Sequence, residues 1–546
     1  MTPLADLRAA VQDAAASVRG GGNGSGPPPT LERARKPEFG DYSTNAAMLL
    51  APVLGEPPRA IAEKLAETLA ERLGDRLERA EVAGPGFLNL FLSDAWYRDA
   101  LRGVLDAGDG YGGAPARTGE RVLVEFVSAN PTGPLTAAGG RHAAYGDALA
   151  RILEFRGDEV EREYYINDHG TQVRKLGESI RARARGEDVP EGGYEGDYVR
   201  DLAAELPSAA EADPDELGRQ GAELMVARIR ATLHRYRVDF DTWFSERSLH
   251  EAEPSPVEHH YEELESQGHV FRAEGAVWLR TSAFGDDKDR VLRRSSGEHT
   301  YFAADVAYHE AKRERGFDRL IDVWGADHHG YVARMKAAFA ALGGDPDKLE
   351  LIIMQFVNVI ERGERASMSK RRGDFVTLDD LLDEIGVDAA RFFLLQRSHD
   401  TTVDLDLDLA RRQSNDNPVY YVQYAHARIA SLLQKAGEER VAGALSAVVA
   451  GSGADGALDP AERALINKLL AFPGEVDEAA ARRAPHRLTV YALELAQEFT
   501  AFYRDCRVVG AEPEAVESFR LALSVAAQRT IARALDLLGV TAPDEM

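Results

Sequence analysis

The stretch Glu125-Phe-Val-Ser-Ala-Asn-Pro-Thr-Gly-Pro-Leu-Thr-Ala-Ala-Gly-Gly-Arg141 contains the end of a β-type run, a turn and the start of a helix. The run from Arg121 to Val127 is broken by Asn130-Pro-Thr-Gly-Pro134, and an Ala-rich helical pattern begins near Gly139. A strand, a tight Gly/Pro turn and a helix N-terminus form the arrangement in which free N–H groups and the helix dipole hold a phosphate. We therefore expect an α/β domain that begins near Arg121 and binds a phosphate at this turn.

Bulk composition limits the class of protein. The 546 residues are enough for about three or four domains, and the single cysteine, Cys506, excludes an internal disulfide and fits a reducing compartment. No run of about 18 apolar residues is present and the N-terminus has no export pattern, so we expect a cytoplasmic protein without a membrane span. The net charge of −26 argues against binding nucleic acid over the whole surface, although it is compatible with a local basic groove.

Patterning along the chain divides it into three expected domains, at 1–116, 117–400 (with insertions at about 180–275) and 401–546. Helical spacing at 1–19 and 60–73 and a strand at 87–92 indicate an N-terminal α+β domain. The middle part alternates strands and helices as a Rossmann-like parallel sheet does, and the C-terminal part reads as an all-helical bundle. Its expected strands lie at 121–127, 161–168, 277–280, 290–293, 320–324 and 351–357.

Glu125 and the pair Tyr301 and Asp305 are candidates for binding a guanidinium group. Glu125 lies at the end of a strand, where open α/β sheets bind ligands, and Tyr301 and Asp305 are four residues apart on an expected helix. Two carboxylates and a phenol can saturate a planar guanidinium, whereas a lysine or a neutral side chain would leave them unpaired. The alternatives are a carboxylate that caps its own turn, and an ordinary core tyrosine beside a solvent-facing aspartate.

Two further segments carry polar side chains in suggestive positions. The basic run Ser367-Met-Ser-Lys-Arg-Arg-Gly373 would deliver an ammonium group to phosphates if it were a flexible loop, although such runs are usually solvated surface. Trp324-Gly-Ala-Asp-His-His-Gly-Tyr331 ends an expected buried strand. Its adjacent histidines would point apart in a strand, and neither a His-Glu-x-x-His helix nor a cysteine pair is present, so we expect no metal site.

Together these motifs resemble those of the arginyl-tRNA synthetases, which are class I aminoacyl-tRNA synthetases. The family's first signature continues Pro-Leu-His-x-Gly-His, but here Thr136 and Gly139 replace both histidines, and Ser367 replaces the first lysine of the second signature. The segment 417–428 resembles the start of the family's anticodon-binding domain. Residues 38–42 and 84–87 resemble its N-terminal domain, so the likeness covers nearly the whole chain.

The resemblance implies ATP-dependent ligation of L-arginine to tRNA(Arg) through an arginyl-adenylate, with Mg²⁺ as cofactor, by a cytoplasmic monomer. The implied arginine-binding residues are Glu125, Asn130, Tyr301, Asp305 and His328. The implied ATP-binding residues are Pro131, Gly133, Pro134, Gly139, Gly140, Asp327, Met368 and Lys370. The implied catalytic residues are Ser369 and Lys370, with Thr136 and His142 as candidates beside them. The implied tRNA-binding residues are Phe39, Tyr42, Asn89, Tyr420, Gln423 and Tyr424.

The missing histidines raise the question of whether the turn is still catalytic. Removing one preorganised donor costs about 3 kcal/mol, so the loss of two requires compensation. We expect the N–H groups of the helix start, the Thr136 hydroxyl or His142 to supply it, because His142 lies one helical turn beyond Gly139. The alternatives are a catalytically impaired paralogue that binds tRNA or regulates, and an enzyme that adenylylates another guanidino compound.

Overall fold

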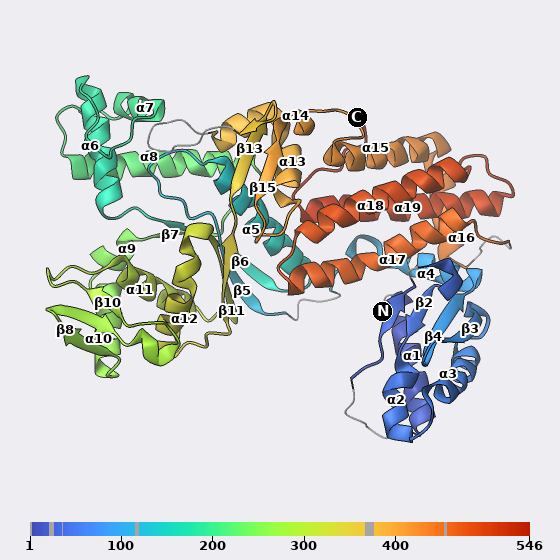
Figure 1. The fold of residues 1–546 in the computed structure, drawn as a ribbon. Coiled ribbons are helices and arrows are strands. Elements are labelled where there is room, and N and C mark those ends of the chain that lie inside the picture. The colour runs from blue at the N-terminus through green and yellow to red at the C-terminus, as the bar shows by residue number, and fades with distance from the viewer. Residues whose placement is uncertain (1–2, 21–26, 35, 115–118, 366–375, 452–455) are drawn as a thin grey trace.

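The computed structural model of the protein describes residues 3–20, 27–34, 36–114, 119–365, 376–451 and 456–546. Figure 1 shows an N-terminal α+β unit, a central domain built on a parallel sheet and a C-terminal bundle of helices. One continuous hydrophobic core extends from Leu7 in the N-terminal unit to Val540 after the last helix. In the ranges given above, none of the helices is both long and apolar enough to cross a membrane. The fold class predicted from the sequence is confirmed.

The N-terminal unit packs helices against a four-stranded antiparallel sheet. Its elements are α1 (Pro3–Arg19), β1 (Leu31–Arg33), η1 (Pro37–Phe39), β2 (Tyr42–Thr44), α2 (Ala46–Leu54), α3 (Pro58–Leu73), η2 (Gly74–Arg76), β3 (Leu77–Ala83), β4 (Phe87–Leu92), α4 (Asp94–Ala107) and η3 (Gly108–Gly110). The predicted helix at 60–73 is α3, which buries Ile61, Leu65, Leu69 and Leu73 because a spacing of four residues places them on one face.

Five parallel strands form the central sheet, in the spatial order β12 (Leu349–Met354), β11 (Arg319–Gly325), β5 (Arg121–Glu125), β6 (Glu159–Ile166) and β7 (Thr242–Ser245). From β5 the chain first adds β6 and β7 on one side, and later adds β11 and β12 on the other. The strand order therefore reverses between β5 and β11. The loops that leave these two strands diverge there, which opens a crevice at their carboxyl ends.

The remaining elements of the central domain cover this sheet or project from it (Figure 1). They are α5 (Ala137–Phe155), α6 (Thr171–Arg185), α7 (Asp197–Glu205), α8 (Pro214–Arg235), α9 (Arg247–Glu251), α10 (Pro256–Ser266), β8 (Val270–Ala273), β9 (Ala276–Leu279), η4 (Thr281–Phe284), β10 (Arg290–Arg293), α11 (Tyr301–Glu314), η5 (Ala326–Tyr331), α12 (Val332–Ala341), β13 (Val357–Glu361), β14 (Glu364–Arg365), α13 (Leu378–Leu395), β15 (Val403–Asp406) and α14 (Leu407–Ala410). Helices α6, α7 and α8 form a separate small core. The segment at about 180–275 also contributes β7 to the sheet, while the domain boundaries themselves stay a prediction.

The single strand predicted over 351–357 is wrong, because the structure divides this segment between β12 and β13, which belong to different sheets. The break lies at Gln355. Its carbonyl accepts a hydrogen bond from the guanidinium of Arg141 at 2.7 Å, and its N–H donates to the carbonyl of His399 at 2.8 Å. These tertiary bonds replace the ladder bonds that a continuous strand would make.

The C-terminal bundle packs against both other parts of the chain. Its helices are α15 (Pro418–Ala436), α16 (Glu438–Val449), α17 (Pro460–Ala481), α18 (His486–Asp505) and α19 (Glu514–Leu537). Figure 1 shows the N-terminal unit lying against α17 through α4. Two buried hydrogen bonds join these parts, from Asn467 to the Tyr97 hydroxyl at 2.9 Å and from the Tyr111 hydroxyl to the Leu469 carbonyl at 3.0 Å.

Candidate active site

A cavity of about 900 Å³ opens at the carboxyl ends of β5 and β11, where the strand order reverses. This is the position at which open α/β sheets bind their ligands. The turn after β5 and the helices α5, α11 and η5 supply most of its lining. The predicted site residues that line it are Glu125, Asn130, Pro134, Thr136, Gly139, His142, Tyr301, Asp305, Asp327 and His328.

The turn after β5 brings Ser128 back onto Glu125. Val127 has a φ of 70° and Ser128 a φ of 39°, a backbone conformation that costs about 1–3 kcal/mol per residue and is typical of functional sites. The Ser128 hydroxyl donates to Glu125 Oε1 at 2.7 Å and accepts the N–H of Tyr165 at 3.1 Å. Ser128 was not among the predicted site residues, although a polar residue three positions after Glu125 was an available signal.

A row of carboxylates crosses the sheet under α11. The strand register pairs Asp322 of β11 with Glu125, and Glu125 with Glu163 of β6. All three side chains are buried, so each needs a hydrogen bond or a cation to offset the loss of water. Tyr308 of α11 donates its hydroxyl to Glu163 at 2.6 Å. The helix thus supplies the partners that the strands lack.

Lys312 of α11 is the cation at the centre of this row. Its Nζ has no exposed surface and lies 2.5 Å from Glu125 Oε2 and 2.7 Å from Asp322 Oδ1. Burial by itself would lower the pKa of Lys312, but the carboxylates of Asp322 and Glu125 raise it to about 12. Burial would likewise raise the pKa of Asp322, and the Lys312 ammonium and His309 bring it down to about 2. Two carboxylates and one ammonium leave one net negative charge below the cavity. No sequence pattern pointed to Lys312.

Asp305 provides another carboxylate to the cavity. It shares a face of α11 with Tyr301, as the spacing predicts, and its Oδ2 accepts a hydrogen bond from the hydroxyl of Tyr331 at 2.5 Å. Burial raises the pKa of Asp305, while Tyr331 and His309 oppose that shift. Tyr301 is 61% exposed and borders the cavity at the first residue of the helix. Tyr331 was missed, although it closes the segment 324–331 that the sequence singles out.

The residues predicted around the turn divide into two groups. Asn130 lines the cavity and donates its amide to Gln172 at 2.7 Å. Pro131 and Gly133 are buried and do not border the cavity. Gly140 is buried as well, and a Cβ at this position would lie 2.7 Å from the Leu378 side chain. Its lack of a side chain therefore serves the packing of α5 on α13.

The start of α5 offers fewer free N–H groups than the sequence predicts. The N–H of Ala137 donates to the carbonyl of Val376 at 3.3 Å, and the N–H of Gly139 donates to the Thr136 hydroxyl oxygen at 3.3 Å. The N–H of Gly140 donates to the Thr136 carbonyl at 3.0 Å. The expectation of a bare helix N-terminus is wrong for these groups, because the protein already uses them. The Thr136 hydroxyl still retains its hydrogen for a second partner.

His142 faces the cavity from the next turn of α5. It lines the cavity together with Thr136 and Gly139, as their helical spacing predicts. Its Nδ1 atom is buried and has no hydrogen-bond partner among the described residues. Burial and the neighbouring Arg141 guanidinium lower the pKa of His142 to about 4. The imidazole is therefore neutral at pH 7, and its single N–H bonds the backbone of Val323.

The 324–331 segment turns its first histidine toward the cavity. Residues 326–331 form the short helix η5 rather than a strand, and His328 lines the cavity while His329 does not. The ring of His328 packs edge-on against Trp324, with the ring centres 5.7 Å apart. Asp327 also borders the cavity. The predicted residues Met368, Ser369 and Lys370 lie outside the described residues.

Half of the predicted tRNA-binding residues are core residues. Tyr42 and Asn89 are buried inside the N-terminal unit, where RNA cannot reach them. Gln423 is buried too, and its amide donates to Asp388 and to the Thr541 carbonyl, both at 2.9 Å. The types of these residues did not show which side of each strand or helix faces solvent.

The other predicted tRNA-binding residues lie at the surface. Phe39 is 47% exposed in the N-terminal unit. On α15, the rings of Tyr420 and Tyr424 stack with an interplanar angle of 7°. The Arg428 guanidinium lies 4.8 Å from the Tyr424 ring centre and 5.5 Å from that of Tyr503. Arg428 and Tyr503 were not predicted, although Arg428 is one helical turn from Tyr424.

Comparisons with known proteins agree along the whole chain. Residues 5–92 match the family model "Arginyl tRNA synthetase N terminal domain", residues 213–427 match "tRNA synthetases class I (R), catalytic domain", and residues 422–546 match "DALR anticodon binding domain". The chain is 44% identical to the arginine–tRNA ligase of Kineococcus radiotolerans, with all of both chains covered. It is also 44% identical to that of Geobacillus thermodenitrificans, with 94% of each chain covered. The solved arginyl-tRNA synthetase of Thermus thermophilus superposes with a TM-score of 0.76 at 27% identity, covering 99% of this chain and 100% of that one.

Proposed function

Because the chain belongs to the class I arginyl-tRNA synthetase family and is an arginine–tRNA ligase, we propose that its cavity binds arginine beside Glu125 and ATP beside the start of α5. The observation that carries this assignment is the cavity itself, which brings Glu125, Asp305 and His142 together from separate elements. Arginine and ATP then meet within one space, as the formation of an arginyl-adenylate requires.

The guanidinium of arginine fits the acidic end of this cavity. Glu125 retains free lone pairs on both oxygens after bonding Ser128 and Lys312. Glu125 and Asp322 share the single ammonium of Lys312, so this group has one net negative charge. Asp305 adds a second charge, held in position by Tyr331. A planar fork with five donors can pair with both carboxylates, which favours arginine over lysine. Tyr301, His328 and Asn130 border the same space and complete the proposed arginine site.

The triphosphate of ATP is proposed to lie along α5 and η5, next to Pro134, Gly139, Thr136 and His142. Mg²⁺ in such sites is held by substrate phosphates with one or two carboxylates, and the exposed Asp327 at the cavity is the carboxylate that fits this role. Mg²⁺ neutralises phosphate charge when it is bound. Thr136 donates its hydroxyl to the phosphates, and His142 donates its N–H when its ring turns away from the backbone of Val323, in place of the two signature histidines.

The compensation by His142 and Thr136 predicts a large effect of either side chain. We expect His142→Ala and Thr136→Ala each to lower the rate of arginine activation by about 10²-fold, since each removes a preorganised donor. Thr136→Ser retains both the hydroxyl and the helix cap and should keep most of the rate. Arginine-dependent pyrophosphate exchange measures the effect. If both alanine variants keep the wild-type rate, the compensation hypothesis is wrong.

The stacked aromatic surface on α15 is proposed to bind unpaired bases of tRNA(Arg), with Phe39 contacting the tRNA from the N-terminal unit. The support is the exposed Tyr424, the half-buried Tyr420 stacked on it and the Arg428 beside them, since aromatic faces stack on bases and guanidinium groups pair with phosphates. We further propose that the protein works as a monomer in the cytoplasm.

Loss of one stacking platform should weaken tRNA binding. We expect Tyr424→Ala to raise the KM for tRNA about tenfold, because base–aromatic stacking contributes about 1–3 kcal/mol per base. Tyr421 is the matched control on the same helix, since its hydroxyl bonds Thr500 at 3.2 Å and its ring packs on the core. Tyr421→Phe should leave the KM for tRNA unchanged. An equal KM in wild type and Tyr424→Ala would remove this surface from the proposed interface.

A single experiment tests the assignment as a whole. Arginine-dependent pyrophosphate exchange, with and without tRNA, followed by charging of that tRNA, is expected to show arginine-specific activation and transfer. Tight tRNA binding without exchange would instead favour an impaired paralogue. Exchange with another guanidino compound but not with arginine would favour a different substrate.

A further inference from the structure

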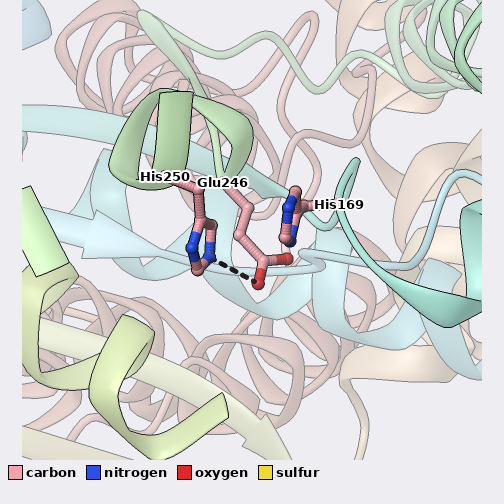
Figure 2. A group of neighbouring side chains, drawn as sticks. All are labelled: His169, Glu246 and His250. Carbon is pink, nitrogen blue, oxygen red and sulfur yellow. Dashed lines mark ion pairs between the residues drawn. The ribbon is translucent and has the colours of Figure 1, made fainter. Parts of the chain in front are cut away.

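His169, Glu246 and His250 form a cluster at the carboxyl edge of the sheet, outside the lining of the arginine cavity. His169 follows β6, and Glu246 follows β7, the adjacent parallel strand. His250 lies on α9, four residues after Glu246 and therefore on the same side of that segment. Figure 2 shows the three side chains directed toward one another, with the Glu246 carboxylate close to both imidazole rings.

The two loops that carry this cluster are fixed to each other by Asp168. Its carboxylate accepts the hydroxyl of Ser245 at 2.6 Å and the N–H of Arg247 at 3.0 Å. The N–H of Glu246 also donates to the carbonyl of Ile166 at 3.0 Å. These bonds lie on either side of the cluster, so its backbone geometry is set before any ligand binds. Hydrogen bonds that fix the backbone beside a ligand help to hold its side chain in position.

The donor atoms are spaced as ligands of one small cation. One nitrogen of each histidine and one oxygen of Glu246 all lie within 4.8 Å of one another, and His250 Nε2 is 3.8 Å from Glu246 Oε1. Tetrahedral ligands about 2.0–2.2 Å from zinc are about 3.4 Å apart. The two imidazole rings stack with their centres 4.1 Å apart and their planes 12° apart, so the exposed His169 must turn its ring to aim a nitrogen at a shared cation.

One atom of the cluster is buried without a hydrogen-bond partner, and it lies beside a mostly buried carboxylate. The Glu246 side chain is 5% exposed and makes no hydrogen bond among the described residues, and its distance of 3.8 Å to His250 is too long for one. His250 Nε2 is buried and has no hydrogen-bond partner either. A buried imidazole nitrogen without a hydrogen-bond partner is rare in native structures and calls for a ligand. A cation between His250 Nε2 and the Glu246 carboxylate would supply that partner.

We propose that His169, Glu246 and His250 bind a divalent transition-metal ion, and that this ion is zinc. Two imidazole nitrogens and one carboxylate oxygen are a donor set that zinc accepts, whereas magnesium and calcium prefer oxygen donors alone. Three protein ligands leave the fourth position of a tetrahedron to water, on the exposed side of His169. The sequence predicts no such site, because its ligands come from segments about 80 residues apart in the chain.

Zinc titration of the metal-stripped full-length protein tests the proposal. We expect one tight Zn²⁺ equivalent by calorimetry, no comparable binding of Mg²⁺, and Co²⁺ absorption bands typical of four-coordinate geometry. His169→Ala, Glu246→Gln and His250→Ala should each weaken Zn²⁺ binding by about 100-fold or more, since loss of a residue that only orients a metal ligand already costs about 10–100-fold. His169 is exposed, so its variant should fold as the wild type does, which circular dichroism checks.

The chain offers a matched control in the second histidine pair, His259 and His260, which lies with Glu263 on α10. His259→Ala should leave the tight site intact. Retention of tight Zn²⁺ binding in both His169→Ala and His250→Ala would overturn the proposal. Its loss in His259→Ala alone, or wild-type binding no tighter for Zn²⁺ than for Mg²⁺, would overturn it as well.

Discussion

Glu125→Gln is expected to lower kcat/KM for arginine by about three orders of magnitude, which corresponds to about 4 kcal/mol. The amide removes the charge that the guanidinium would neutralise, and it presents an N–H₂ group where the arginine and Lys312 both need an acceptor. The KM for ATP should change little, because Glu125 lies at the acidic end of the cavity. Pyrophosphate exchange at varied arginine, with ATP saturating, measures the effect.

Asp322→Asn is the matched control for this experiment. Asp322 belongs to the same carboxylate row and bonds the same Lys312, but it does not line the cavity. It should reduce stability while lowering kcat/KM for arginine much less than Glu125→Gln does. Equal losses in the two variants would mean that Glu125 acts through the fold rather than by contacting arginine.

Lys312→Met is expected to lower the free energy of unfolding by about 3–5 kcal/mol, because it leaves the buried carboxylates of Glu125 and Asp322 without their cation. Chemical denaturation of the full chain measures the shift. Arg219→Met on α8 provides the control. Arg219 is 40% exposed and pairs with the exposed Glu216 and Glu223, so its loss should cost far less stability. A similar cost for both variants would contradict the role given to Lys312.

The ion pair of Lys312 and Asp322 predicts how the free energy of unfolding depends on pH. The pKa of Asp322 is depressed to about 2 in the folded protein, so its contribution is present above the ordinary aspartate range near 4 and is lost as pH falls toward 2. The pKa of Lys312 is raised to about 12, so its contribution is present below about 10.4 and is lost as pH rises through 12. The difference between wild type and Lys312→Met should therefore narrow on acidification, because protonated carboxylates need no cation.

Much of the site was predictable because it depends on the spacing of residues along single strands and helices. Glu125 ends a strand and a turn follows it, while Tyr301 and Asp305 occupy one face of a helix, so short-range geometry already aims them at the crevice. His142 follows Gly139 by the spacing that puts both on one side of α5. Such periodicities survive in any tertiary arrangement that keeps the strand and the helix.

Other features depended on which faces meet. Tyr42 is an aromatic residue and Gln423 a polar one, and both types are common at exposed binding surfaces. Only the packing of the elements decides that these two are buried. The strand predicted over 351–357 ends early because Arg141, more than 200 residues away, bonds the carbonyl of Gln355. The sequence around Gln355 does not indicate that a residue so distant in the chain bonds its carbonyl.

The sequence by itself determined the fold class, the family and the strand-end carboxylate that opens the first signature. The tertiary structure decided the rest, because it sets the charge balance around that carboxylate. Only the packing of α11 on the sheet places Lys312 between Glu125 and Asp322, and only the adjacency of β6 and β7 brings His169 to Glu246. Burial makes the Lys312 pairing obligatory, since a charge removed from water must find a partner, and that partner is chosen in space rather than along the chain.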